Sequence, residues 1–145
     1  MKVLFDTTFL VEIDRKNKEA INLAKILSVQ DAEMIVSTIT VSEILAGTFL
    51  RKDHSKAFEN ARMALAQFDW KDFEGSIAMK TAELLAFQIV HGSPTSFQDT
   101  AIAATALENK ADFLVTENKK HFEIFPELKN KVKTIKEALK GQGAR

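Results

Sequence analysis

Short apolar segments alternate with longer helical patterns along the 145-residue chain. Runs rich in branched or aromatic residues predict strands at 2–5, 33–37, 112–116 and 131–135. Apolar positions at helical spacing predict helices at 8–14, 17–29, 40–51, 54–68, 74–90 and 98–109. Because parallel neighbours need crossover connections, near-continuously apolar strands that alternate with helices predict a parallel sheet covered on both faces. The fold class is therefore expected to be α/β.

Length and composition predict a single ordinary globular domain. Hydrophobic residues make up 46% of the chain and charged residues 28%, so neither a disordered nor a fibrous protein is indicated. The sequence contains no internal repeat or linker. We expect one domain over residues 1–140 and a flexible polar tail over 141–145, which reads KGQGAR from Lys140 onward.

Cysteine and hydropathy bear on the compartment. The chain has no cysteine, which excludes disulfides and thiolate metal sites and fits a reducing environment. Asp6 interrupts the apolar start, unlike the core of a signal peptide, and no run approaches the ~18 apolar residues of a membrane span. We therefore expect a cytoplasmic protein without a membrane partner.

Charge is unevenly distributed although the formal net charge is zero. Residues 1–109 carry 11 Lys and Arg against 15 Asp and Glu, whereas residues 110–145 carry 9 against 5. The basic C-terminal quarter could attract a polyanion. Solvated lysines on a surface helix and tail are the more ordinary explanation.

Four polar residues are predicted at the carboxyl edge of the sheet, where functional groups gather in open parallel sheets. Asp6 follows the first strand, Glu43 lies in the first turn of the helix after the second strand, Asp99 begins the helix 98–109, and Asn118 follows the strand 112–116. Each acid alone has a structural explanation as a helix cap, a turn residue or a first-turn acid that complements the helix dipole.

Glu43 and its neighbours illustrate both interpretations. Glu43 shares a helix side with Ala46 and Gly47, and a glycine inside a helix costs up to ~1 kcal/mol relative to alanine, which suggests close approach of a ligand there. Alternatively, Thr40 or Ser42 caps the helix and Glu43 only complements its dipole.

Convergence of the acids favours a metal site over these separate explanations. Three carboxylates at one edge would repel each other unless a cation or basic groups compensated them. An all-oxygen cluster suits Mg²⁺ or Mn²⁺. His54, His91 and His121 lack the close pairing of a zinc site and are expected at the surface or in loops.

Taken together, four motifs resemble the PIN-domain ribonucleases, particularly the VapC-like toxins of toxin–antitoxin pairs, over essentially the whole chain. These motifs are LFDTTFL with Asp6, VSTITVSEILAG with Glu43, QDTAIAATAL with Asp99 and LVTENKKHF with Asn118. No single motif is specific, but their order and spacing are.

The resemblance implies a three-layer α/β/α sandwich with a central, mostly parallel sheet and a metal-dependent ribonuclease that uses activated water for in-line attack. It implies that Asp6 and Asp99 bind Mg²⁺ or Mn²⁺ directly, that Glu43 binds it directly or through water, and that Asn118 orients a water or a second ion. It further implies an RNA substrate, a cognate antitoxin as partner and a homodimer. The alternative is a PIN fold that binds RNA or a protein without cutting.

Departures from the family pattern bear on the predicted site. Thr8 stands where Asn or Ser is commoner and keeps a hydroxyl able to bond Asp6, and Thr116 is expected to support the site through its hydroxyl. Asn118 replaces the Asp of the fullest acidic set, and Glu117 is expected to point to the other side of the strand.

Two further segments are candidates for binding partners. The helices 40–51 and 54–68 are expected to form a hairpin, with Phe58, Ala61, Leu65 and Phe68 on one apolar stripe of the second helix. Core packing is the default explanation of that stripe, and the family resemblance implies that part of the hairpin forms an antitoxin groove. Lys119, Lys120 and His121 are candidates for phosphate contacts or members of a solvated turn.

Overall fold

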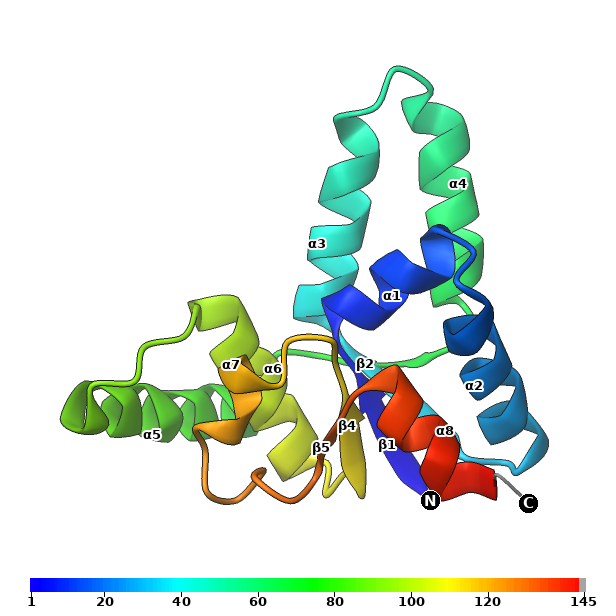
Figure 1. The fold of residues 1–145 in the computed structure, drawn as a ribbon. Helices are drawn as coiled ribbons and strands as arrows, with labels where there is room; N and C mark the ends of the chain where they lie inside the picture. The colour runs from blue at the N-terminus through cyan, green and yellow to red at the C-terminus, as the bar shows by residue number, and fades with distance from the viewer. Residues whose placement is uncertain (144–145) are drawn as a thin grey trace.

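The computed structural model describes residues 1–143 and has a central five-stranded sheet between layers of helices (Figure 1). The strand order is β3-β2-β1-β4-β5 and every neighbouring pair is parallel. The strands are β1 (Lys2–Phe5), β2 (Glu33–Ser37), β3 (Asp69–Lys71), β4 (Phe113–Val115) and β5 (Val132–Lys133). The predicted α/β/α sandwich is confirmed.

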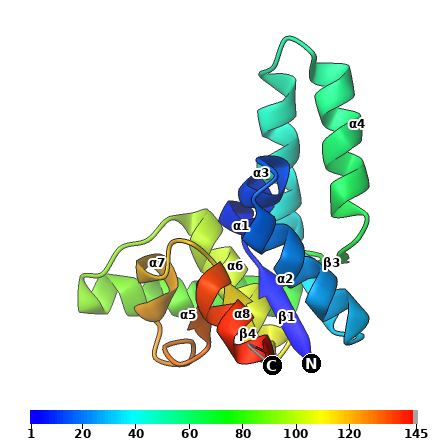
Figure 2. The same cartoon turned by 45° about the vertical axis from the view of Figure 1, so that its right-hand side comes forward.

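Helices cover both faces of the sheet and form a projecting hairpin (Figures 1 and 2). One face carries α1 (Thr7–Asp14), α2 (Lys18–Val29) and α8 (Ile135–Gly143). The opposite face carries α5 (Gly75–His91), α6 (Phe97–Glu108) and α7 (Lys120–Glu123). The hairpin consists of α3 (Thr38–Phe49) and α4 (His54–Leu65), which lie side by side and extend away from the sheet.

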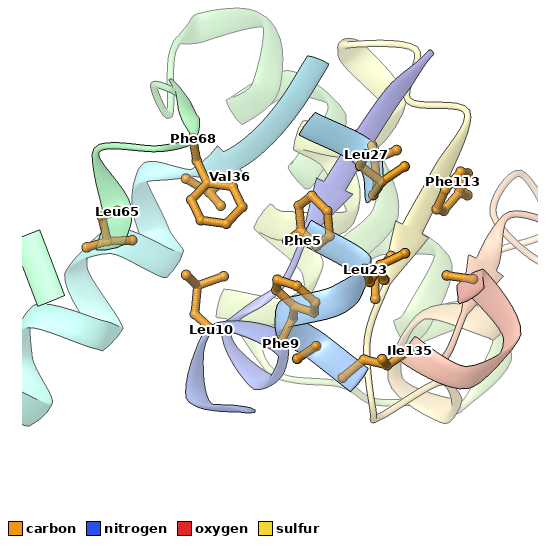
Figure 3. Packing of buried hydrophobic residues seen from close by; sticks show 14 of the residues in the cluster. Phe5, Phe9, Leu10, Leu23, Leu27, Val36, Leu65, Phe68, Phe113 and Ile135 are labelled. Atoms are coloured by element: carbon orange, nitrogen blue, oxygen red, sulfur yellow. The ribbon is translucent and has the colours of Figure 1, made fainter. Parts of the chain in front are cut away.

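Two hydrophobic cores lie on either side of the sheet because successive side chains of a strand point to opposite faces. In β1, Val3 and Phe5 belong to the core under α1 and α2, whereas Leu4 belongs to the core under α5 and α6. Phe5 packs against Phe9 and Phe68, with ring centroids 4.4 and 5.4 Å apart (Figure 3). Burial on both faces fixes β1 at the centre of the sheet.

Several element boundaries differ from the sequence predictions. The short strand β3 was not predicted because its residues, Asp-Trp-Lys, are exposed or only partly buried and form no apolar run. The helix α8 was also missed, and it continues to Gly143, into the segment 141–145 that we expected to be a flexible tail. Residues 144 and 145 lie outside the described residues.

The start of α3 also differs from prediction. The helix begins at Thr38 because the Ser37 side chain accepts a hydrogen bond from the Ile39 N–H, so neither Thr40 nor Ser42 is the cap. Glu43 consequently lies in the second turn and not the first. The explanation of Glu43 as a first-turn acid therefore does not apply, since the helix-dipole effect falls off beyond the first turn.

Within residues 1–143, none of the helices combines the length and apolar character needed to cross a membrane.

Candidate active site

The order of the strands creates a switch point at β1. From β1 the chain builds outward to β2 and β3, and it then returns to add β4 and β5 on the other side of β1. In open α/β sheets, ligands bind beyond the carboxyl ends of the strands at such a point. Asp6 directly follows β1 and Thr116 directly follows β4, so both residues lie at this position.

Asp6 is held by hydrogen bonds to both carboxylate oxygens. Thr8 Oγ1 donates to Asp6 Oδ1 at 2.6 Å, and Thr116 Oγ1 donates to Asp6 Oδ2 at 2.6 Å. The Phe9 N–H also donates to Oδ1, which makes Asp6 the N-cap of α1. The hydrogen bond predicted from Thr8 to Asp6 is confirmed, and the Thr116 hydroxyl makes a second bond to the same carboxylate.

Asp6 is strongly buried, with 2% of its surface exposed. The pKa of its carboxyl group is raised from 3.8 to about 6. Burial is the largest cause and the negative charge of Asp99 adds to it, whereas the hydrogen bonds from Thr116, Thr8 and Phe9 lower the pKa. An ionised Asp6 is therefore unfavourable in its apolar surroundings. A cation beside it would relieve that cost.

Glu43 reaches the same edge from the second turn of α3. Its Oε1 accepts a hydrogen bond of 2.7 Å from Thr7 Oγ1, and Thr7 directly follows Asp6 in the chain. Thr7 Oγ1 also lies 3.3 Å from the hydroxyl of the buried Thr40. Thr7 thus couples the position of Glu43 to the end of β1 while the Glu43 side chain stays exposed.

Asp99 approaches from the opposite face, in the first turn of α6. The Ser96 side chain caps this helix by accepting from the Asp99 N–H at 3.0 Å. The carboxylate of Asp99 is 22% exposed, and its Oδ2 lies 2.8 Å from His121 Nδ1. The negative charge of Asp99 contributes to the raised pKa of Asp6, so the two carboxylates interact electrostatically.

The segment after β4 contributes mainly through its backbone. The Asn118 N–H donates to Thr116 Oγ1 and the Glu117 N–H donates to Thr8 Oγ1, both at 2.9 Å. These two hydroxyls therefore connect the segment to Asp6. The Asn118 side chain is exposed, and the structure leaves its predicted role untested.

Glu117 and Lys119 are directed to α8 and away from the acids. Glu117 Oε1 accepts a hydrogen bond of 2.9 Å from the Ile135 N–H, which confirms the predicted orientation of Glu117 to the other side. Lys119 Nζ forms ion pairs with Glu123 and Glu137 at 3.2 and 3.1 Å. Lys119 consequently helps to fix the turn and does not extend freely toward a phosphate group.

Each acidic side chain of the site is engaged by a neighbour: Asp6 by Thr8 and Thr116, Glu43 by Thr7, and Asp99 by His121. Within residues 1–143, no group of three or more His, Asp or Glu side chains is arranged so that it could hold a metal ion. The donor chemistry still fits Mg²⁺ or Mn²⁺, since these ions use one or two carboxylates and keep several waters. Asp6 and Asp99 provide such a pair.

Sequence reasoning missed Thr7, and it did not predict the contact that His121 makes with Asp99. Thr7 lies next to a predicted site residue and carries a hydroxyl, but its contact with Glu43 depends on how α1 and α3 pack. His121 was expected to be a surface or loop residue. Its side chain is 50% exposed, as expected, and it also contacts Asp99; its candidate role as a phosphate contact stays a prediction.

An apolar groove of about 270 Å³ adjoins the site and lies between α1 and the α3–α4 hairpin. Its lining includes Leu10, Ile44, Gly47, Ala61 and Leu65, and it reaches Thr7 and Glu43 at the site. A Cβ atom added to Gly47 would meet nothing within 4 Å, so the space beside this residue is open. A molecule in this groove would contact Glu43.

Comparisons with known proteins agree with this architecture. The PIN domain family model matches residues 3–128, so the chain belongs to the PIN domain family. No curated protein sequence matches the chain.

The fold is similar to solved structures of toxin–antitoxin proteins. VapBC2 from Rickettsia felis, bound to a DNA fragment from their promoter, matches with a TM-score of 0.83 and 22% identity over 92% of this chain and 98% of that chain. FitAcB from Neisseria gonorrhoeae matches with a TM-score of 0.75 and 23% identity over 90% and 95%. A toxin–antitoxin complex from Klebsiella pneumoniae matches with a TM-score of 0.69 and 26% identity over 92% and 97%.

Proposed function

We propose that this protein is a Mg²⁺- or Mn²⁺-dependent ribonuclease that hydrolyses RNA phosphodiesters and serves as the toxin of a toxin–antitoxin pair. The observation that carries the proposal is the Asp6 carboxylate, which is buried at the switch point of the sheet beside a second acid, Asp99. A buried acid with a raised pKa lowers the stability of the fold, and such groups cluster at functional sites. Membership of the PIN family and likeness to toxin–antitoxin structures support the same conclusion.

Asp6 and Asp99 would hold the ion directly, and Glu43 would hold it directly or through a water molecule. When bound, the ion supplies positive charge that activates water and compensates charge on the phosphodiester. Carboxylate oxygens and water are the ligands that these hard cations prefer.

The residues of the chain itself have distinct tasks. Thr8 and Thr116 fix both oxygens of Asp6 so that its carboxylate does not rotate. Thr7 holds Glu43 at the edge of the site, where an exposed carboxylate can accept a proton from water. Asn118 is proposed to orient a water molecule or a second ion through its exposed amide.

The antitoxin partner is part of the proposal because similar solved structures are VapBC and FitAcB complexes. The groove between α1 and the α3–α4 hairpin supports it, since an apolar segment bound there would also contact Glu43. An inhibitor at this position would block the site while its affinity came from the apolar lining.

A homodimer is the expected assembly. The outer face of α5 supports this expectation, since the side chains of Met79, Ile89 and Val90 are 72%, 83% and 78% exposed. Exposed apolar residues gathered on one face often mark protein interfaces.

The test is cleavage of structured RNA by purified protein with and without Mg²⁺. We expect cleavage only with Mg²⁺ or Mn²⁺, and we expect Asp6→Asn and Asp99→Asn to abolish it while far-UV circular dichroism stays unchanged. Asp72→Asn, at an exposed position outside the site, is the control. Unchanged cleavage by both site variants would reject the mechanism and favour a PIN fold that binds without cutting.

A further inference from the structure

We propose that His121 is a positioning residue for metal binding: its imidazole orients the Asp99 carboxylate toward the ion. This inference rests on the proposed function, because it assigns a role toward the metal that Asp6 and Asp99 would bind. The observation is the 2.8 Å contact between His121 Nδ1 and Asp99 Oδ2. Because a carboxylate accepts hydrogen bonds, the contact requires the proton on Nδ1 and leaves Asp99 Oδ1 for a ligand.

The start of α6 offers the Asp99 carboxylate another possible hydrogen-bond partner, the Ser96 N–H. Asp99 lies three residues after the cap Ser96, the position from which an acid commonly turns back to bond the N–H of the cap residue. Among residues 1–143 the first half of this arrangement is present, with the Asp99 N–H donating to Ser96 Oγ, but the carboxylate bonds His121 and not the Ser96 N–H. The contact with His121 thus holds Asp99 away from a purely structural role.

His121 is itself fixed by the turn that carries it. The next residue, Phe122, is completely buried, and the His121 N–H donates to the Asn118 carbonyl at 3.0 Å. Lys119, which begins the turn, is tied to Glu123 and Glu137. The imidazole therefore stands at a defined place beside α6, as a group that orients a metal ligand must.

The contact between His121 and Asp99 is not explained by a contribution to folding stability. The His121 side chain is 50% exposed and that of Asp99 is 22% exposed, and a polar contact between partly exposed side chains contributes little to folding. Partners that orient metal ligands, in contrast, typically change metal affinity 10- to 100-fold when they are removed.

The experiment compares three substitutions at one position. In His121→Asn the amide nitrogen is bonded to Cγ, as Nδ1 is in histidine, so it can still donate to Asp99. In His121→Gln the amide lies one bond further out, and in His121→Ala the donor is lost. Mn²⁺ affinity is measured by isothermal titration calorimetry, and the unfolding midpoint is measured without metal.

We expect His121→Ala and His121→Gln to weaken Mn²⁺ binding by about 10-fold or more, with little change in the midpoint without metal. His121→Asn should recover most of the affinity. His54→Asn, at the exposed start of α4, is the control and should bind Mn²⁺ like the wild type. If His121→Ala fails to fold, the comparison of the Asn and Gln variants gives the answer.

Wild-type Mn²⁺ affinity in His121→Ala, or equal affinities of the Asn and Gln variants, would overturn the inference while leaving the proposed function intact. A wild-type protein that binds no Mn²⁺ would overturn both.

Discussion

The Thr116 hydroxyl donates a hydrogen bond of 2.6 Å to Asp6 Oδ2, although 110 residues separate the two in the chain. The contact forms because β1 and β4 are parallel neighbours whose carboxyl ends coincide. It connects a buried acid to the strand on the other side of the switch point.

Thr116→Val removes this donor and keeps the shape of the side chain. We expect the variant to lose about 1.5–3 kcal/mol of stability at pH 7, the range for a hydrogen bond to a charged group, and to cleave RNA more slowly through a lower kcat. Urea unfolding and steady-state kinetics are the measurements. Thr105→Val is the matched control, because Thr105 is also buried but bonds only the Ala101 carbonyl within α6. Equal kinetic losses in both variants would contradict a specific role for Thr116.

Asp6 gives a prediction about the pH dependence of stability. Its pKa is raised from 3.8 to about 6 by burial, so the folded protein binds more protons than the unfolded chain between these values. Without metal, the contribution of Asp6 to the free energy of unfolding should therefore be fully present below about pH 4. It should be lost as the pH rises through the folded-state pKa of about 6. A difference of about two pKa units corresponds to a loss of about 3 kcal/mol.

Asp6→Asn removes this titration, and asparagine can still cap α1. We expect the variant to be more stable than the wild type at pH 7 without metal, although it cleaves no RNA. Urea unfolding at pH 4 and pH 7 measures the difference, with Asp72→Asn as the surface control. A wild type and an Asp6→Asn variant with the same pH dependence would show that Asp6 is not strained in the folded state.

Two substitutions of Gly47 distinguish an effect on helix stability from an effect on partner binding. Alanine at this position meets no neighbouring atom, so Gly47→Ala should stabilise α3 by up to about 1 kcal/mol. Gly47→Leu should instead fill the groove between α1 and the hairpin, and we expect it to weaken capture of the protein encoded by a short adjacent reading frame. Thermal unfolding and co-purification measure the two effects. Undiminished capture by Gly47→Leu would exclude this groove as the antitoxin site.

The exposed face of α5 leads to a prediction about assembly. Ile89 is 83% exposed, so Ile89→Lys should leave the fold intact, and we expect it to convert a dimer to a monomer in light scattering after gel filtration. Val29→Lys, at an 85% exposed position on α2, should remain dimeric. A wild-type monomer, or a dimeric Ile89→Lys variant, would reject the α5 interface.

The central strands could be predicted from the sequence, because residues 3–5 of β1 and 35–36 of β2 are buried and form short apolar runs. The same reasoning located Asp6, since a charge that ends such a strand is conspicuous. It missed β3, whose place at the edge of the sheet requires no apolar run, and it began α3 two residues late because the cap Ser37 looks like the end of a strand.

The identity of the side chains that hold the acids depends on how separate elements pack together. The contacts of Thr116 with Asp6, Thr7 with Glu43 and His121 with Asp99 join residues from separate elements. Periodicity reports the burial of each element by itself, and it contains no information about which hydroxyl or imidazole a neighbouring element brings within 3 Å. That information arises from strand order and helix packing, which place the ends of β1, β4, α6 and α7 around one point.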